Sequence, residues 1–146
     1  MSDRLKSNLL VLVQFVCLAL LALTGPLVAR QPLLLVLEAA GGFLGLWAIG
    51  SMRIGNFNIT PEVRRNSALV AAGPYRWVRH PMYLAVLMVA AALVLDHFTP
   101  MRALIGLVLA VDLLVKLTFE ERLLAAHHPE YAGYAQRTAR LIPFIF

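Results

Sequence analysis

The segment Gly73-Pro74-Tyr75-Arg76-Trp77-Val78-Arg79-His80-Pro81-Met82-Tyr83 joins a polar loop to an apolar run that continues to about Leu95. Proline is favoured in the first helical turn, so Pro81 predicts the start of a helix and puts His80 at its boundary. The segment concentrates two arginines, a histidine and three aromatic residues at the mouth of this helix. About forty residues later a second apolar run leads into Glu120-Glu121. Polar groups that reach the same water surface from two membrane helices indicate a site.

The composition around this segment is typical of a membrane protein. Sixty per cent of the 146 residues are hydrophobic and 14% are charged, and the apolar residues occur in long runs. Nucleic-acid binding does not explain the net charge of +5, because the basic residues lie in short loops between apolar runs. The single cysteine, Cys17, excludes a disulfide within the chain.

The apolar runs predict an all-α, polytopic membrane protein with about four transmembrane helices. The expected spans are residues 8–28, 32–50, 81–95 and 101–119. At ~1.5 Å per residue, the third span covers only about 22 Å of a ~30 Å hydrocarbon core, so its full crossing stays open. A loop at 52–79 separates the middle spans, and the tail at 120–146 is expected to form an interfacial helix. One domain, residues 1–146, is expected from the length.

The distribution of charge predicts the orientation. With an inside N-terminus, the outer turns hold only Arg30 and Arg102. The inner segments hold the other basic residues: Arg4, Lys6, Arg53, Arg64, Arg65, Arg76, Arg79, Lys116, Arg122, Arg137 and Arg140. By the positive-inside rule, both termini and the long loop are expected to face the cytoplasm.

Three ionisable residues in the fourth expected span, Asp112, Lys116 and Glu120, are spaced four apart and therefore share one helix face. Charges inside a span are costly and usually face protein or a water-filled cavity, which favours a polar pocket. The alternative is that Asp112 and Lys116 neutralise each other while Lys116 reaches to the membrane surface. Glu120-Glu121 stands at the expected end of this span, where a helix C-terminus disfavours anions, so a cation or hydroxyl is expected nearby.

His80 and Tyr83 are three residues apart on a helix, share a face and are therefore candidates for binding a polar ligand. For Trp77 we favour a place in an interfacial aromatic belt. The pair Gly41 and Gly45 predicts a close helix contact. The adjacent His127-His128 does not predict a metal site, because neighbouring histidines project to different sides of a helix and no third ligand is near.

These residues together resemble a known family, the isoprenylcysteine carboxyl methyltransferases, and equally their bacterial relatives and the phospholipid N-methyltransferases. The resemblance covers about the C-terminal half of the chain, from Asn56 onward. Its motifs are Leu69-Val70, Gly73-Pro74-Tyr75, Arg79-His80-Pro81-Met82-Tyr83, Glu120-Glu121, Glu130-Tyr131 with Tyr134, and Leu141-Ile142-Pro143.

The resemblance implies an integral-membrane enzyme that uses S-adenosylmethionine, releases S-adenosylhomocysteine and methylates a lipid-like acceptor that enters from the bilayer. It assigns Lys116 to the acceptor and gives Glu120 a catalytic role, whereas family members often carry arginine at the position of Lys116. Relatives also usually have glycine at the position of Ala85. The cofactor contacts that it implies are Ser67, Ala68, Leu69, Val70, Tyr75, His80, Pro81, Met82, Tyr83, Glu120 and Glu121.

Two other classes stay open at this point. One is a non-catalytic membrane helix bundle that binds lipid or a partner protein, in which the polar stripe would serve assembly. The other is a membrane reductase that uses a nicotinamide cofactor, although the sequence contains no recognisable pyrophosphate-binding motif. The sequence identifies neither the methyl acceptor nor the oligomeric state.

Overall fold

The computed structural model describes residues 3–52 and 70–143, and the described chain is all-α. The helices begin and end where proline and polar residues interrupt the apolar runs, and three of them start with proline. The elements are α1 (Asp3–Leu23), α2 (Pro32–Ser51), the 3₁₀ helix η1 (Gly73–Arg76), α3 (Pro81–Asp96), α4 (Pro100–His127) and α5 (Tyr131–Ala135).

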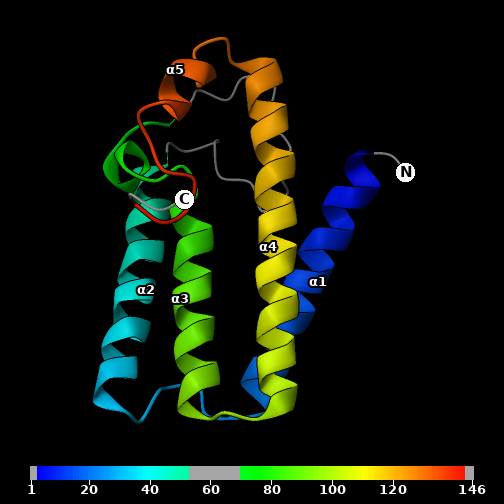
Figure 1. Cartoon of the computed structure of the whole chain (residues 1–146), viewed down its shortest axis with the longest axis vertical. Coiled ribbons are helices and arrows are strands. Elements are labelled where there is room, and N and C mark those ends of the chain that lie inside the picture. The colour runs from blue at the N-terminus through cyan, green and yellow to red at the C-terminus, as the bar shows by residue number, and fades with distance from the viewer. Residues whose placement is uncertain (1–2, 53–69, 144–146) are drawn as a thin grey trace.

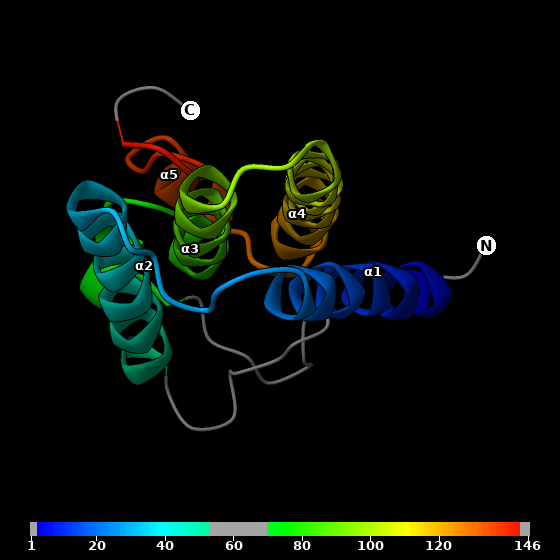
Figure 2. The ribbon, with the colours of Figure 1, turned by 90° about the horizontal axis from the view of Figure 1, so that it is seen from below.

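The four long helices run up and down in an antiparallel bundle (Figure 1). Helix α2 packs along α3, helix α1 packs on α4, and α3 joins the two pairs through its contact with α4. Seen from below, α1 lies across one side of α4 rather than beside α2 (Figure 2). Helix α1 also leans away from α4 toward its own N-terminus (Figure 1). The start of α3 and the later turns of α4 lie at the same end of the bundle as α5.

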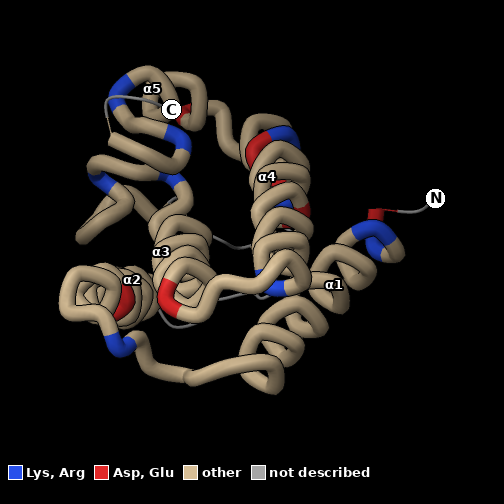
Figure 3. The backbone as a smooth tube through the Cα atoms, turned by 60° about the horizontal axis from the view of Figure 1, so that its bottom comes forward, with Lys and Arg blue, Asp and Glu red and all other residues tan. Residues whose placement is uncertain are grey.

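The expectation of four spans is met only in part. Helices α1 and α2 are long and apolar enough to cross a membrane, while α3 is a shorter apolar helix of 16 residues. A span normally needs ~20 apolar residues, so α3 is short for one. Helix α4 is long enough, but it buries Arg102, Asp112 and Lys116 among its apolar residues. Charged residues lie around α5, at the start of α1 and along α4, with others at the opposite helix ends (Figure 3).

Two expected boundaries are wrong. The first helix covers residues 3–23 rather than 8–28, because Thr24-Gly25-Pro26 ends it directly. The fourth helix does not end at 119 but continues to His127. Glu120-Glu121 therefore lies inside a helix, and the argument from an unfavourable helix C-terminus does not apply to it. The tail is correspondingly less helical than expected: after α4 it holds only the five-residue α5, and residues 144–146 lie outside the described part of the chain.

The contact between α2 and α3 depends on glycine, as the spacing of Gly41 and Gly45 predicted. A Cβ atom at Gly41 would lie 3.0 Å from the carbonyl oxygen of Ala85 and equally close to Met88 and Val89. A Cβ atom at Gly45 would lie 3.4 Å from the Cβ of Ala85. The resemblance predicts glycine at the position of Ala85. Its methyl group is accommodated because the facing residues of α2 are glycines, which leave room for it.

Replacing Gly41 with leucine is expected to lower the free energy of unfolding by about 2 kcal/mol, because the larger side chain forces α2 away from α3. Gly42 is the matched control, since nothing lies within 4 Å of a Cβ atom at that position. Thermal unfolding of both variants in the same detergent, followed by circular dichroism, measures the difference. Equal melting temperatures for the Gly41→Leu and Gly42→Leu proteins would contradict this account of the contact.

The end of the bundle opposite α5 is closed by buried and turn-capping charges. Arg102, which the sequence suggested was an outer-turn charge, is fully buried. Its guanidinium donates to the carbonyl oxygens of Leu21 (2.8 Å) and Leu93 (2.9 Å), in the last turns of α1 and α3. Helix C-termini carry partial negative charge, so one arginine satisfies two of them. Asp96 accepts hydrogen bonds from the backbone of residues 30 and 31, which fixes the start of α2 beside the end of α3.

Candidate functional site

The segment before α3 is held in place by the C-terminal part of the chain. The backbone N–H of Arg79 donates to the Ala139 carbonyl at 2.8 Å, and the N–H of Ala139 donates to the Trp77 carbonyl at 2.9 Å. A parallel bridge joins Val78 to Ala139. Because Pro81 then begins α3, the side chain of His80 is fixed at the junction of a short strand-like pairing and a helix.

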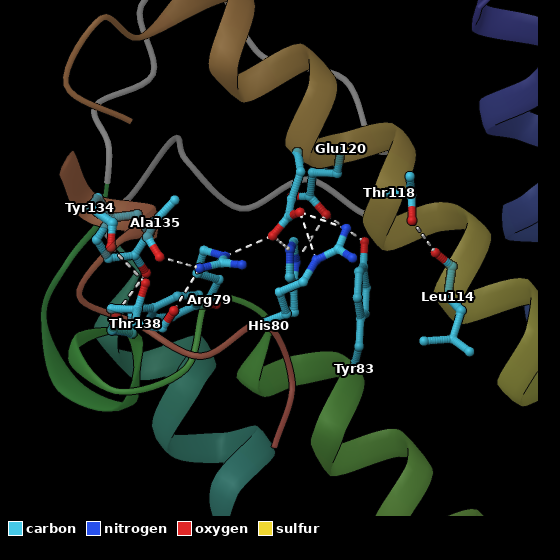
Figure 4. A network of polar contacts seen from close by, with 12 residues as sticks. Arg79, His80, Tyr83, Leu114, Thr118, Glu120, Tyr134, Ala135 and Thr138 are labelled. Carbon is cyan, nitrogen blue, oxygen red and sulfur yellow. Dashed lines mark hydrogen bonds and ion pairs between the residues drawn. The ribbon is translucent and has the colours of Figure 1, made fainter. Parts of the chain in front are cut away.

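Glu121 is the centre of an ion-pair network at this junction. One carboxylate oxygen lies 2.7 Å from Nε of Arg79 and 3.4 Å from Nε2 of His80, and the other lies 2.7 Å from Arg140. Arg79 also donates to two backbone carbonyls near α5, those of Ala135 and Thr138, so its guanidinium bridges α4 and the tail (Figure 4). This network locks α4 to the segment that positions His80.

Electrostatics keep Glu121 ionised. Burial alone raises the pKa of this carboxyl group, but hydrogen bonds from His80, Arg140 and Arg79 outweigh it and hold the pKa well below its usual range. The cation that the sequence led us to expect near Glu120-Glu121 is therefore present as two arginines.

Glu120 faces a different direction and meets residues of α3. It accepts a hydrogen bond of 2.7 Å from the hydroxyl of Tyr83, and its carboxylate lies 3.7 Å from Nδ1 of His80 (Figure 4). The His80 and Tyr83 rings are stacked, with centroids 5.4 Å apart and planes within 1°. The prediction that these two residues share a face is confirmed, and their common partner is Glu120. The Glu120 side chain is 30% exposed, so it remains accessible to a ligand.

Lys116 lies one turn before Glu120 and is buried, with 2% of its surface exposed. Its Nζ donates to the side-chain oxygen of Gln14 on α1 at 2.7 Å and lies 5.5 Å from the centre of the Tyr83 ring. Lys116 does not reach the membrane surface, because its side chain is buried, so that part of the alternative is wrong. Asp112 lies one turn before Lys116 on the same helix and interacts with it electrostatically, although the two form no direct ion pair among the described residues. Asp112 is buried too, and its Oδ2 atom has no hydrogen-bond partner.

These side chains surround a cavity of about 230 Å³ between α1, α3 and α4. Six residues expected at the site line it: Tyr75, Met82, Tyr83, His80, Lys116 and Glu120. Val70, Pro81 and Glu121 are described but do not line it. Ser67, Ala68 and Leu69 lie outside the described residues.

The cavity also has walls that the sequence analysis did not assign to the site. Gln14 and Phe15 come from α1, Met52 follows α2, Arg79 precedes α3, and Val86 lies one turn into α3 beyond Tyr83. Gln14 carried a usable signal, because an amide inside an otherwise apolar run is costly and tends to face protein. Met52 and Val86 carried none, since apolar residues at helix ends and on apolar helices are common.

Two buried tyrosines, Tyr75 in the lining of the cavity and Tyr134 on α5, are neutral at physiological pH. The Tyr134 hydroxyl donates to the Tyr75 carbonyl at 2.6 Å, which ties α5 to η1. Burial raises the pKa of Tyr134 to about 12. Burial, followed by the charge of Glu120, raises the pKa of Tyr75 further above its ordinary value. Both phenols therefore keep their protons, and with them the ability to donate a hydrogen bond, throughout the physiological range.

The donor set of the cavity suits a ligand that carries a positive charge and hydroxyl or amino groups. Glu120 offers carboxylate oxygens for an ammonium group or for ribose hydroxyls, and the Tyr75 and Tyr83 rings offer aromatic faces for a positive charge. For a metal ion the donors are less suitable. Within residues 3–52 and 70–143, no group of three or more His, Cys, Asp or Glu side chains lies close enough to hold one. His128 instead lies 3.6 Å from Glu130.

Comparison with known proteins gives independent evidence on the family of this chain. The model of the isoprenylcysteine carboxyl methyltransferase family matches residues 33–126, which is more than half of the chain. The chain is 35% identical over 81 residues to the cobalt-zinc-cadmium resistance protein CzcN of Cupriavidus metallidurans. It is 32% identical over 82 residues to the nickel-cobalt-cadmium resistance protein NccN of Alcaligenes xylosoxydans xylosoxydans. Each match covers 55% of this chain and 38% of the relative's length.

Proposed function

The chain belongs to the isoprenylcysteine carboxyl methyltransferase family, and on that premise we propose that it is an integral-membrane methyltransferase that uses S-adenosylmethionine. The observation that carries the proposal is the cavity in which His80, Tyr83, Lys116 and Glu120 converge between apolar helices. We propose that residues 1–146 form one such domain. Its acceptor is a lipid-like or amphiphilic molecule, of the isoprenylcysteine carboxylate type or the phospholipid amine type.

In this proposal the cofactor occupies the His80–Tyr83–Glu120 side of the cavity. Bound S-adenosylmethionine supplies an electrophilic methyl group on a sulfonium. Glu120 accepts hydrogen bonds from the ribose or amino group, and the Tyr83 hydroxyl, 2.7 Å from Glu120, holds that carboxylate in position. Tyr75 and Met82 complete the wall, and Pro81 fixes the start of the helix that presents them. We keep Ser67, Ala68, Leu69 and Val70 as proposed contacts on the basis of the family resemblance.

Glu121 supports the same site through its partners. Its carboxylate already accepts hydrogen bonds from Arg79 and Arg140 and lies close to His80. We therefore assign it to orienting His80 and to fixing the segment before α3, which positions the proposed cofactor contacts. Positioning of this kind matters because methyl transfer is an in-line displacement and depends on alignment in a site that excludes water.

Lys116 defines the acceptor side. Its ammonium donates to Gln14 and lies over the Tyr83 ring, and it makes no direct ion pair with a carboxylate among the described residues, so donor capacity remains for an acceptor. A carboxylate acceptor would be oriented by this charge and needs no proton removed. An amine acceptor would first have to lose a proton, and Glu120 is the nearest base on the same helix face.

The positive-inside rule supports an orientation with both termini and the cavity at the cytoplasmic surface. In that orientation the cofactor arrives from the cytoplasm and the acceptor arrives laterally from the bilayer. The names of the two relatives describe resistance to cobalt, zinc, nickel and cadmium. We propose that a role of this chain in metal resistance would come from methylation of a membrane component. Metal binding by the described residues is not part of the proposal.

Calorimetric titration of S-adenosylhomocysteine into the detergent-purified protein tests the proposal. We expect micromolar binding that weakens about 10- to 100-fold in Glu120→Ala, because a hydrogen bond to a charged group is lost. His80→Ala is expected to lose a similar amount. Glu130→Ala is the matched control, because its side chain is 61% exposed and lies outside the cavity.

Two results would overturn the proposal. The first is the absence of binding by a folded, monodisperse wild-type protein, which favours the non-catalytic helix bundle. The second is unchanged affinity in both Glu120→Ala and His80→Ala, which removes the site assignment even if the protein binds the cofactor. Titration of a nicotinamide nucleotide in parallel tests the reductase alternative.

A further inference from the structure

A second hollow lies on the other side of the contact between α1 and α4. It measures about 730 Å³ and shares no lining residue with the proposed methyl-transfer cavity. Helix α1 leans away from α4 toward its N-terminus (Figure 1), and the groove is lined by these two helices. Its apolar walls are two leucines of α1 and four residues of α4: Leu9, Leu10, Val111, Leu114, Val115 and Phe119.

The walls of this groove are apolar and uncovered. Leu9 is 49% exposed, Val111 53% and Val115 51%, which is a large apolar surface for neighbouring positions. Thr118, the one hydroxyl residue in the lining, donates to the carbonyl of Leu114 in its own helix, so its hydrogen is already used (Figure 4). The walls therefore suit a hydrocarbon chain and offer nothing to a polar one.

The charged side chains of the groove lining lie at one end of the groove, and both are basic. Lys6 on α1 and Arg122 on α4 are the charged residues of the lining. Val111, Val115, Thr118 and Arg122 follow one another at intervals of three and four, so a single face of α4 leads from valine to arginine. Arg122 has one carboxylate contact, at 3.9 Å from Asp3, between side chains that are 65% and 63% exposed. Such exposed pairs are weak and exchange readily for a better anion.

We propose that this groove binds an anionic phospholipid, with one acyl chain between α1 and α4 and the phosphate between Lys6 and Arg122. The chemistry of the groove selects this occupant, since an apolar tail and an anionic head must be joined in one molecule. Basic residues at a membrane surface attract anionic lipid head groups. The site depends on the membrane setting of the helices and is independent of methyl transfer. A bound lipid would also fill the groove and hold α1, which carries Gln14, against α4.

Native mass spectrometry tests the site. The purified protein is titrated with phosphatidylglycerol and, separately, with phosphatidylcholine that has the same acyl chains. We expect one phosphatidylglycerol to bind on the order of tenfold more tightly than phosphatidylcholine, and the preference to disappear in the double variant Lys6→Gln/Arg122→Gln. The control Arg30→Gln/Arg137→Gln removes the same charge away from the groove and should keep the preference.

A second variant tests the acyl chain rather than the head group. Leu114→Trp fills the groove and leaves both cations in place, so it should weaken phosphatidylglycerol binding while the protein stays folded and monodisperse. Equal affinity for the two lipids, a preference that survives in Lys6→Gln/Arg122→Gln, or unchanged binding by Leu114→Trp would each overturn the proposal. A dimer that excludes lipid would overturn it in favour of a second copy of the chain in the groove.

Discussion

Replacing Glu121 with glutamine is expected to lower the free energy of unfolding by about 3 kcal/mol, because it leaves two arginines of a largely buried network without their carboxylate. Arg79 is 10% exposed and lies 2.7 Å from Glu121, and Arg140 lies equally close. The same change removes one of the two carboxylates beside His80, so binding of S-adenosylhomocysteine should weaken as well. Chemical unfolding in detergent, followed by circular dichroism, measures the loss of stability.

Glu130→Gln is the matched control for this variant, since its carboxylate is well exposed and its stability effect should be small. The pH dependence provides an independent readout. Because the pKa of Glu121 is lower in the folded protein than its ordinary value of 4.5, the carboxylate contributes stability above that pH and loses it as the pH falls. The wild-type protein should therefore lose stability in acid more steeply than Glu121→Gln. Parallel acid profiles would show that the network contributes nothing.

Replacing Lys116 with methionine is expected to reduce kcat/KM for an anionic acceptor by about 100- to 1000-fold while S-adenosylhomocysteine binds almost normally. Methionine keeps much of the length of the buried side chain but removes the charge that we assign to the acceptor. Lys116→Arg restores the charge in the form that many family members carry and should recover part of the activity. Transfer of a radiolabelled methyl group to candidate acceptors, together with cofactor titration, measures both effects.

Arg137→Met is the control, because it removes one positive charge from a residue outside the cavity. An acceptor of the amine type predicts a different pattern from a carboxylate. Lys116→Met would then leave kcat/KM unchanged or raise it, since a fixed positive charge opposes an ammonium group. Loss of cofactor binding in Lys116→Met would contradict the division of the cavity into a cofactor side and an acceptor side.

The sequence predicted the helical class and several contacts correctly, for local reasons. Long apolar runs have no alternative to helix in a membrane, and proline marks helix starts, so α2 and α3 were expected within one residue of their observed ends. The pairs His80 with Tyr83 and Gly41 with Gly45 were found because three- and four-residue spacings fix a shared helix face. The family resemblance from residue 56 onward rested on the same local motifs and agrees with the match to residues 33–126.

What the sequence missed depends on residues far apart in the chain. The continuation of α4 to His127 was hidden because the apolar run ends at Phe119, whereas the helix goes on where Glu121 meets Arg79 and Arg140. Gln14 joined the site only because α1 packs against α4 and brings its amide to Lys116. Arg102 was expected at a water-facing turn and is buried because two helices end around it.

Composition, apolar runs and the spacing of short motifs thus determined the helical class, the membrane class and the family resemblance, since each of these properties can be read along the chain without knowing which helices pack together. The tertiary structure alone decided which polar groups of different helices meet. A buried charge without a partner is unfavourable, so it needs a polar group nearby. Which group is near depends on which helices pack together. Lys116 therefore donates its hydrogen bond to Gln14 of α1 and lies over the Tyr83 ring of α3, two contacts that its own helix cannot supply.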